Sequence, residues 1–186
     1  MRTLVLGGIR SGKSRWAEET IADSLTPEQP VRYLASGPAT DSDSAASQDW
    51  DQRVARHRDR RPGHWSTVET DDIATQLRQV PDTPTLVDDL GTWLTSAMDS
   101  HRAWEGGSPP AALQDTIDDM LAAVGEFGST LVLVSPEVGL TVVPATASGR
   151  RFTDELGTLN QRMAALCDRV VLVVAGQAVP IKPSRA

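Results

Sequence analysis

The stretch TLVLGGIRSGKS, residues 3–14, decides the fold of this 186-residue chain. Residues 3–6 form a short apolar run, and residues 7–14 match the pattern G-x-x-x-x-G-K-[S/T]. An amphipathic segment follows, which we expect to be a helix over residues 13–24. A strand, a glycine-rich turn and a helix in this order predict a phosphate-binding loop, or P-loop.

Each residue type in this pattern has a role in binding phosphate. The glycines let the loop curl so that backbone N–H groups point at phosphate oxygens, and the helix adds the positive end of its dipole. The Lys13 ammonium can reach the β and γ phosphates, and the Ser14 hydroxyl can ligate Mg²⁺. A turn that contains Lys and Ser by chance is the alternative, but the chain has only two lysines. We predict nucleotide binding by Gly7, Gly8, Ile9, Arg10, Ser11, Gly12, Lys13 and Ser14, with a catalytic role for Lys13.

Short apolar runs and longer amphipathic segments alternate along the rest of the chain. This alternation predicts an α/β fold: a single P-loop NTPase-type domain over residues 1–186, with a mainly parallel sheet of six or seven strands and helices on both faces. We expect loops at residues 37–47 and 100–110 and core contacts from Trp50, Val54, Trp93 and Leu94. The expected strands are 3–6, 31–35, 85–87, 130–134, 170–175 and a short closing strand at 179–182, and the expected helices are 13–24, 49–60, 71–79, 111–126 and 152–167.

Composition narrows the possible functions. The formal net charge of −7 repels phosphate backbones and argues against general nucleic-acid binding. No stretch approaches the ~20 apolar residues that span a bilayer, and the first apolar run is too short for a signal peptide. The single cysteine, Cys167, is expected to be a small buried hydrophobe in a reducing compartment. We therefore expect a cytoplasmic protein.

An acidic pair is the predicted metal partner of the P-loop. A P-loop needs an acidic residue to hold the metal's water shell, normally at the end of a neighbouring apolar strand. Residues 86–89 read Leu-Val-Asp-Asp. Asp88 directly follows the apolar run, whereas Asp89 would face the other way under strand alternation. We therefore predict that Asp88 ends the strand beside the P-loop and binds metal with Ser14, a solvated turn aspartate being the alternative.

A basic segment stands out in this otherwise acidic chain. Residues 53–61 hold five of the sixteen arginines. On a helix that ends before Pro62, Arg53 and His57 would lie one turn apart, and arginine side chains suit a triphosphate. The residues alone leave two interpretations open: a nucleotide-contacting helix on which His57 does chemistry, and a solvated basic face. No His/Cys/Asp spacing resembles a zinc site.

Further landmarks run along nearly the whole chain. They are LGGIRSGKSR at 6–15, YLA at 33–35, RVARHR at 53–58, WSTVE at 65–69, EVGL at 137–140 and LNQR at 159–162. In these motifs and their order the chain resembles the bifunctional adenosylcobinamide kinase and adenosylcobinamide-phosphate guanylyltransferase family of cobalamin synthesis. It departs from the family at Pro136, where Asn is common, and in a longer segment at residues 37–49.

The resemblance implies a function and a set of site residues. It implies that ATP or GTP phosphorylates adenosylcobinamide, and that GMP from GTP is then joined to the phosphate, giving adenosylcobinamide-GDP. It also implies a covalent guanylyl group on His57, Mg²⁺ as cofactor and a homotrimer. The implied nucleotide contacts beyond the P-loop are Ala35, Ser36, Arg58, Asp59, Arg60, Arg61, Glu69 and Asp88. Two alternatives are a simple P-loop small-molecule kinase and a nucleotide-binding switch protein without a small-molecule acceptor.

Overall fold

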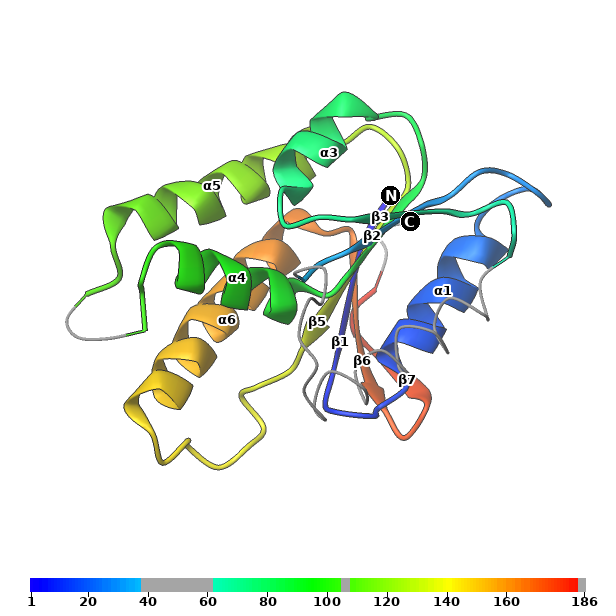
Figure 1. The fold of residues 1–186 in the computed structure, drawn as a ribbon. Coiled ribbons are helices and arrows are strands. Elements are labelled where there is room, and N and C mark those ends of the chain that lie inside the picture. Colours follow the sequence, from blue (N-terminus) through cyan, green and yellow to red (C-terminus); the bar gives the residue numbers. More distant parts are fainter. Residues whose placement is uncertain (38–61, 105–107, 184–186) are drawn as a thin grey trace, which may run out of the picture.

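The computed structural model describes residues 1–37, 62–104 and 108–183. In these ranges the chain forms one seven-stranded sheet with five helices packed against it (Figure 1). The strands are β1 (Arg2–Gly7), β2 (Arg32–Ala35), β3 (Ser66–Glu69), β4 (Thr85–Asp88), β5 (Leu131–Pro136), β6 (Arg169–Val174) and β7 (Gln177–Lys182). The helices are α1 (Lys13–Asp23), α3 (Ile73–Gln79), α4 (Leu90–Ser100), α5 (Ala111–Glu126) and α6 (Ala147–Leu166).

The strand order is β3-β2-β4-β5-β1-β6-β7, and every neighbouring pair is parallel except β6 and β7. The central strands are nearly continuous apolar runs because helices cover both of their faces. The predicted mainly parallel sheet is confirmed. Strand β3 was not predicted, since its sequence STVE is short and polar and lies at the edge of the sheet. The helix expected at residues 49–60, with Trp50 and Val54, lies outside the described residues.

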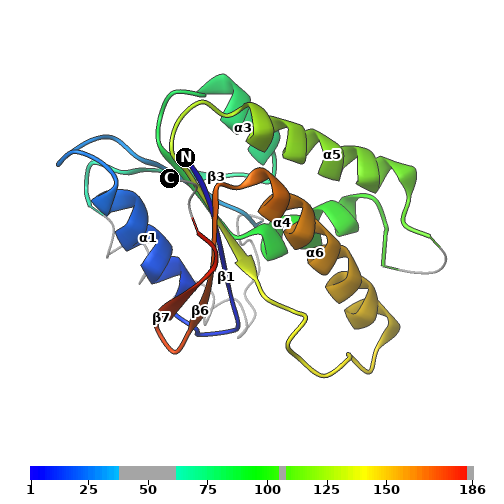
Figure 2. The ribbon, with the colours of Figure 1, turned by 180° about the vertical axis from the view of Figure 1, so that it is seen from behind.

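Helices lie on both faces of the sheet, as Figures 1 and 2 show from opposite sides, and a hydrophobic layer fills each face. Helix α1 packs on one face, where its Ala17 and Ile21 belong to one buried cluster with Val5, Tyr33 and other strand residues. Helices α3, α4, α5 and α6 pack on the other face. Trp93 and Leu94 of α4 belong to this second layer and are buried, which confirms the core role expected for them.

Helix α6 is longer than the sequence predicted. It begins at Ala147 rather than at residue 152, because the Thr146 hydroxyl caps it by accepting a hydrogen bond from the Gly149 N–H (3.1 Å). At its other end, the Lys182 ammonium on β7 donates to the carbonyl oxygens of Cys167 (2.6 Å) and Ala164 (3.0 Å). These bonds satisfy carbonyls that no further turn of helix can reach.

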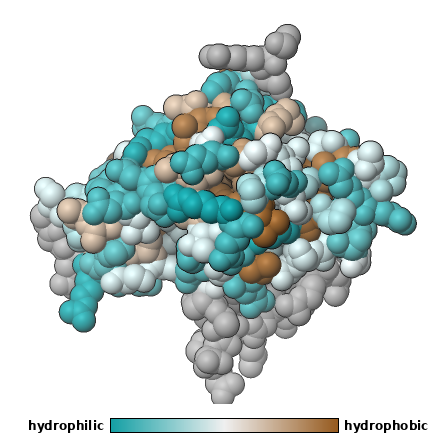
Figure 3. All heavy atoms as spheres, turned by 90° about the horizontal axis from the view of Figure 1, so that it is seen from above, coloured by the Kyte–Doolittle hydropathy of each residue, from teal (hydrophilic) through white to brown (hydrophobic). Residues whose placement is uncertain are grey.

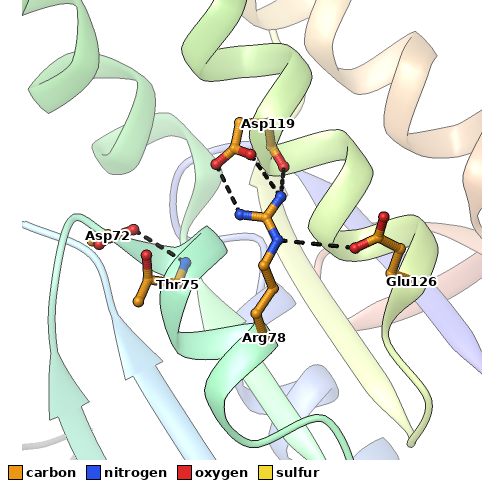
Figure 4. A network of polar contacts seen from close by, with 5 residues as sticks. All are labelled: Asp72, Thr75, Arg78, Asp119 and Glu126. Carbon is orange, nitrogen blue, oxygen red and sulfur yellow. Dashed lines mark hydrogen bonds and ion pairs between the residues drawn. The ribbon is translucent and has the colours of Figure 1, made fainter.

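A polar network joins α3 to α5 at the surface (Figure 4). The Arg78 guanidinium donates to both carboxylate oxygens of Asp119 (3.0 and 2.6 Å) and lies 3.9 Å from Glu126. The hydrogen bonds from Arg78 hold the pKa of the Asp119 carboxyl below its ordinary value. Because these side chains are exposed, the network orients the two helices and adds little stability. The surface seen from above in Figure 3 is mostly hydrophilic, with only small separated hydrophobic patches.

None of the helices in the described ranges is long and apolar enough to cross a membrane.

The buried cysteine provides a test of the core. Cys167 is 1% exposed, as expected, and burial raises the pKa of its thiol to about 12. Because the thiolate is the reactive form, labelling by a thiol reagent at pH 8 should be slower in the native protein than in urea by on the order of 10³-fold. The measurement is the rate of thionitrobenzoate release from Ellman's reagent. Equal rates with and without urea would contradict the packing around Cys167.

Candidate active site

The predicted P-loop connects the carboxyl end of β1 to the first residue of α1. β1 ends at Gly7 and α1 begins at Lys13, so the turn lies at the carboxyl edge of the sheet. Inside the turn the Ser11 N–H donates to the Gly8 carbonyl (3.3 Å), and the Trp16 N–H donates to the Gly12 carbonyl (3.0 Å). The strand-loop-helix arrangement predicted from the sequence is confirmed.

Neighbouring strands hold this loop at both ends. The Glu137 N–H, just after β5, donates to the Gly7 carbonyl (3.1 Å). On the other side, the Gly176 N–H donates to the Ser11 carbonyl (2.8 Å). Gly176 lies in the two-residue turn between β6 and β7, where positive φ angles of 50° at Ala175 and 77° at Gly176 close the hairpin. The sequence motif did not predict these contacts, because they come from residues more than a hundred positions away.

Two glycines of the loop are required by geometry. A Cβ on Gly7 would lie 2.4 Å from the Ser11 Oγ and 2.8 Å from the Val173 carbonyl oxygen. Gly12 has a φ of 95°, in the left-handed region that favours glycine, and a Cβ there would lie 3.2 Å from the Cα of Gly176. The loop therefore has this shape only with glycine at both positions.

The amino end of α1 is suited to bind an anion. No side chain caps it, and none caps α5, whereas α3, α4 and α6 are capped by Asp72, Asp89 and Thr146. Its first N–H groups and the positive end of its dipole face the loop, beside the partly exposed Lys13 and Ser14. This is the arrangement that binds phosphate groups in P-loop proteins.

Acidic residues gather at the same edge of the sheet. Ala35, Glu69 and Asp88 pair in one row across β2, β3 and β4. Tyr33, two residues before Ala35, belongs to the hydrophobic layer beneath α1, and side chains two residues apart on a strand share a face. Glu69 and Asp88 therefore lie on the face of the sheet that carries α1. Three of the contacts implied by the resemblance are thus brought together by register.

The structure separates the roles of the two neighbouring aspartates. Asp88 accepts a hydrogen bond from the Tyr33 hydroxyl (2.6 Å), which orients its carboxylate on the α1 face. Asp89 accepts from the Thr92 N–H (2.8 Å) and caps α4 on the opposite face. The expectation that Asp88 ends the strand beside the P-loop is wrong. β5 lies between β4 and β1, because the order of strands depends on long-range pairing that a local pattern does not specify.

Two buried hydroxyls at this edge have no hydrogen-bond partner among the described residues. They are the Oγ atoms of Ser11, in the P-loop, and Ser36, directly after β2. The Ser36 N–H donates to the Asp88 carbonyl (3.2 Å), so Ser36 lies beside the acidic row. Buried hydroxyls are normally paired, and a nucleotide bound at this edge could supply the partner.

The donor set at this edge fits Mg²⁺ in the way P-loop sites hold it. The described ranges contain no group of three or more His, Cys, Asp or Glu side chains that could enclose a metal ion. Mg²⁺ in such sites keeps several waters and takes only one or two protein oxygens besides the phosphates. The Ser14 hydroxyl and the Asp88 carboxylate, on the same face of the sheet, are oxygen donors of the right kind.

Five of the predicted site residues belong to the basic segment around His57. His57, Arg58, Asp59, Arg60 and Arg61 lie outside the described residues. Their roles remain predictions from the sequence and the resemblance. Conversely, Tyr33, Glu137 and Gly176 were family landmarks without a predicted role, and the folded sheet brings each into contact with a site residue.

A glycine-constrained loop between a parallel strand and an uncapped helix, with acidic residues at the ends of nearby strands, defines a P-loop nucleotide-dependent enzyme. The chain matches the family described as cobinamide kinase / cobinamide phosphate guanyltransferase over residues 3–181, and it belongs to that family. The resemblance noted in the sequence is thereby confirmed.

Relatives in two bacteria are similar over nearly their whole length. The chain is 39% identical over 185 residues to the bifunctional adenosylcobalamin biosynthesis protein CobP of Pseudomonas aeruginosa, covering 98% of both chains. It is 36% identical over 197 residues to the bifunctional adenosylcobalamin biosynthesis protein CobU of Salmonella typhimurium, covering 98% of this chain and all of that one. A solved structure of the P4 protein from bacteriophage phi6 in complex with ADP is more distant. It has 14% identity and a TM-score of 0.42, and the match covers 96% of this chain and 53% of that one.

The glycine constraint at the P-loop can be tested with a matched pair of variants. Gly7→Ala forces a Cβ against the Ser11 side chain and the Val173 carbonyl, so the free energy of unfolding should fall by about 1–3 kcal/mol and affinity for a fluorescent GTP analogue should drop. Gly8→Ala is the control, because a Cβ there meets nothing within 4 Å. It should change stability by less than about 0.5 kcal/mol. Equal effects of the two variants in urea denaturation would contradict the described loop.

Proposed function

We propose that this chain phosphorylates adenosylcobinamide and then guanylylates the product, as its family membership indicates. The observation that carries the proposal is the glycine-constrained P-loop, which places the uncapped amino end of α1 at the carboxyl edge of the sheet. We further propose that residues 1–186 act as one catalytic domain in the cytoplasm. We also propose that the protein is a homotrimer, because the sequence resembles the family.

In the kinase step the P-loop binds the polyphosphate of ATP or GTP. The hydroxyl oxygen of the aminopropanol arm attacks the γ-phosphorus, a new O–P bond forms, and the bond to the β–γ bridging oxygen breaks. The hydroxyl proton is released and a nucleoside diphosphate leaves. Lys13 and the first N–H groups of α1 stabilise the negative charge on the phosphate oxygens during this transfer.

Mg²⁺, when bound, would neutralise charge on the β and γ phosphates. Ser14 and Asp88 are the residues proposed to hold it. Tyr33 keeps the Asp88 carboxylate oriented through its 2.6 Å hydrogen bond. Ala35, Ser36 and Glu69 complete the proposed nucleotide contacts at the ends of β2 and β3.

In the guanylyltransferase step His57 is the proposed nucleophile. A neutral ring nitrogen attacks the α-phosphorus of GTP, an N–P bond forms, and pyrophosphate leaves as the α–β bridging bond breaks. An oxygen of adenosylcobinamide phosphate then attacks the same phosphorus and the N–P bond breaks. The product is adenosylcobinamide-GDP, and the His57 side chain is returned to its unmodified form. Arginines close in sequence favour the neutral imidazole and would balance the charge of the transferring group. The proposed set is Arg56, Arg58, Arg60 and Arg61, and Asp59 is a further proposed nucleotide contact.

Labelled GTP distinguishes the proposed function from the two alternative functions, a simple small-molecule kinase and a switch protein. Incubation with adenosylcobinamide should move γ-label and then α-label from GTP to the corrinoid. A simple small-molecule kinase would move only γ-label, to this or another acceptor. A switch protein would release labelled inorganic phosphate and label no corrinoid. Either of those two results would contradict the proposed function.

The assignment of the metal ligand predicts different effects for two neighbouring substitutions. Asp88→Asn should raise the Mg²⁺ concentration needed for half-maximal phosphoryl transfer by about 10-fold or more, because it removes a charged oxygen ligand. Asp89→Asn is the matched control, since asparagine caps a helix as well as aspartate does. It should leave the Mg²⁺ requirement unchanged. If Asp89→Asn has the larger effect, the assignment of Asp88 is wrong.

The covalent intermediate predicts a labelled protein. Incubation with α-labelled GTP should produce an acid-labile, base-stable adduct, as a phosphoramidate requires, and His57→Asn should abolish it. His64→Asn should retain the adduct at the wild-type level and serves as the control. Phosphoryl transfer should survive in His57→Asn, because transfer to a hydroxyl needs no covalent enzyme intermediate. An undiminished adduct in His57→Asn would place the nucleophile elsewhere.

A further inference from the structure

A large cavity lies under the connection from β5 to α6. Its volume is about 580 Å³, within the range of small-molecule sites. Residues 137–144 of this connection form one wall, and the cavity is further lined by α6 and by residues of β1, β6 and β7. The lining is largely apolar and includes Leu6, Val138, Val143, Val170, Leu172 and Ile181.

The connecting loop presents apolar side chains to solvent. Leu140, Val142 and Val143 are 77%, 92% and 73% exposed, although each lines the cavity. The loop is held by the first turn of α6: Arg150 Nη1 donates to the carbonyl oxygens of Pro144 (3.0 Å) and Ala145 (2.8 Å). Neighbouring apolar side chains that stay exposed in an ordered loop indicate a surface that a ligand covers.

A glycine in the middle of α6 keeps the cavity open. Gly157 is unfavourable in a helix interior compared with alanine, yet a Cβ at this position would meet nothing within 4 Å. Close packing against a neighbouring element therefore does not explain the glycine. Gly157 lines the cavity, so any larger side chain would project into space that is now empty.

The cavity adjoins the P-loop. Leu6, which lines it, directly precedes Gly7, and Glu137, which also lines it, donates its N–H to the Gly7 carbonyl (3.1 Å). Both features lie at the carboxyl ends of β1 and β5, the edge at which parallel sheets bind ligands. A molecule in the cavity can therefore extend an arm toward a phosphate held by the loop.

We infer that this cavity is the acceptor site and receives an edge of the corrin ring of adenosylcobinamide. The inference rests on the proposed function. A corrinoid has apolar ring faces and a rim of amide groups, which matches an apolar lining interspersed with the polar side chains of Thr153, Asp154 and Gln161. The aminopropanol arm would extend past Glu137 toward the P-loop. A second copy of this chain is the other possible occupant, and the test separates the two.

The first experiment fills the cavity. Gly157→Leu should raise the KM for adenosylcobinamide at least 10-fold and weaken its binding measured by absorbance titration, while the KM for GTP and the melting temperature stay near wild type. Gly125→Leu is the matched control, because Gly125 lies on α5 and does not line the cavity, and a Cβ there would also meet nothing within 4 Å. An unchanged corrinoid KM in Gly157→Leu would overturn the inference.

The second experiment removes an apolar contact without filling space. Val142→Asn should raise the corrinoid KM at least 3-fold, whereas Val179→Asn, on an exposed strand residue that does not line the cavity, should not. If Val142→Asn instead lowers the oligomeric mass in light scattering and leaves the corrinoid KM unchanged, the loop is a subunit contact and the inference is wrong. A wild-type enzyme that transfers no label to the corrinoid would refute the proposed function itself. Normal transfer with unaffected variants would refute only this acceptor site.

Discussion

The turn from β1 into α1 depends on one steric constraint: there is no room for a side chain at Gly7. Its Cα position faces the Ser11 hydroxyl and the Val173 carbonyl, and any Cβ would overlap both. The same turn is fastened by backbone hydrogen bonds from Glu137 on one side and Gly176 on the other. Because α1 begins only six residues after Gly7, the position of its open amino end follows directly from this contact.

The parallel sheet brings residues of several other strands to the same edge as the P-loop. Its parallel strands end at one edge, so residues far apart in the sequence meet there without a dedicated loop. The register places Glu69 and Asp88 on either side of Ala35, on the face that carries α1. The other face receives α6 and the apolar connection before it. A nucleotide and a large corrinoid acceptor can thus share one edge while lying against opposite faces of the sheet.

Much of the fold and part of the candidate site could be predicted from the sequence. The features that could not be predicted depend on long-range contacts or carry no local signal. The P-loop and the central strands are encoded locally, by glycine spacing and by apolar runs such as LVLV in β5. The polar edge strand β3 carries no such signal. The position of Asp88, two strands from β1, and its contact with Tyr33 depend on strand order, which is a long-range property. The role of His57 stays a prediction, because the residue lies outside the described ranges.

The central claim is that nucleotide and corrinoid bind side by side at the carboxyl edge. Resonance energy transfer tests it directly, since a corrinoid absorbs where an N-methylanthraniloyl-labelled GTP analogue emits. With a non-hydrolysable labelled analogue bound, saturating adenosylcobinamide should strongly shorten the fluorescence lifetime, and Gly157→Leu should require a higher corrinoid concentration for the same effect. An unchanged lifetime, with both ligands shown to be bound, would contradict the account.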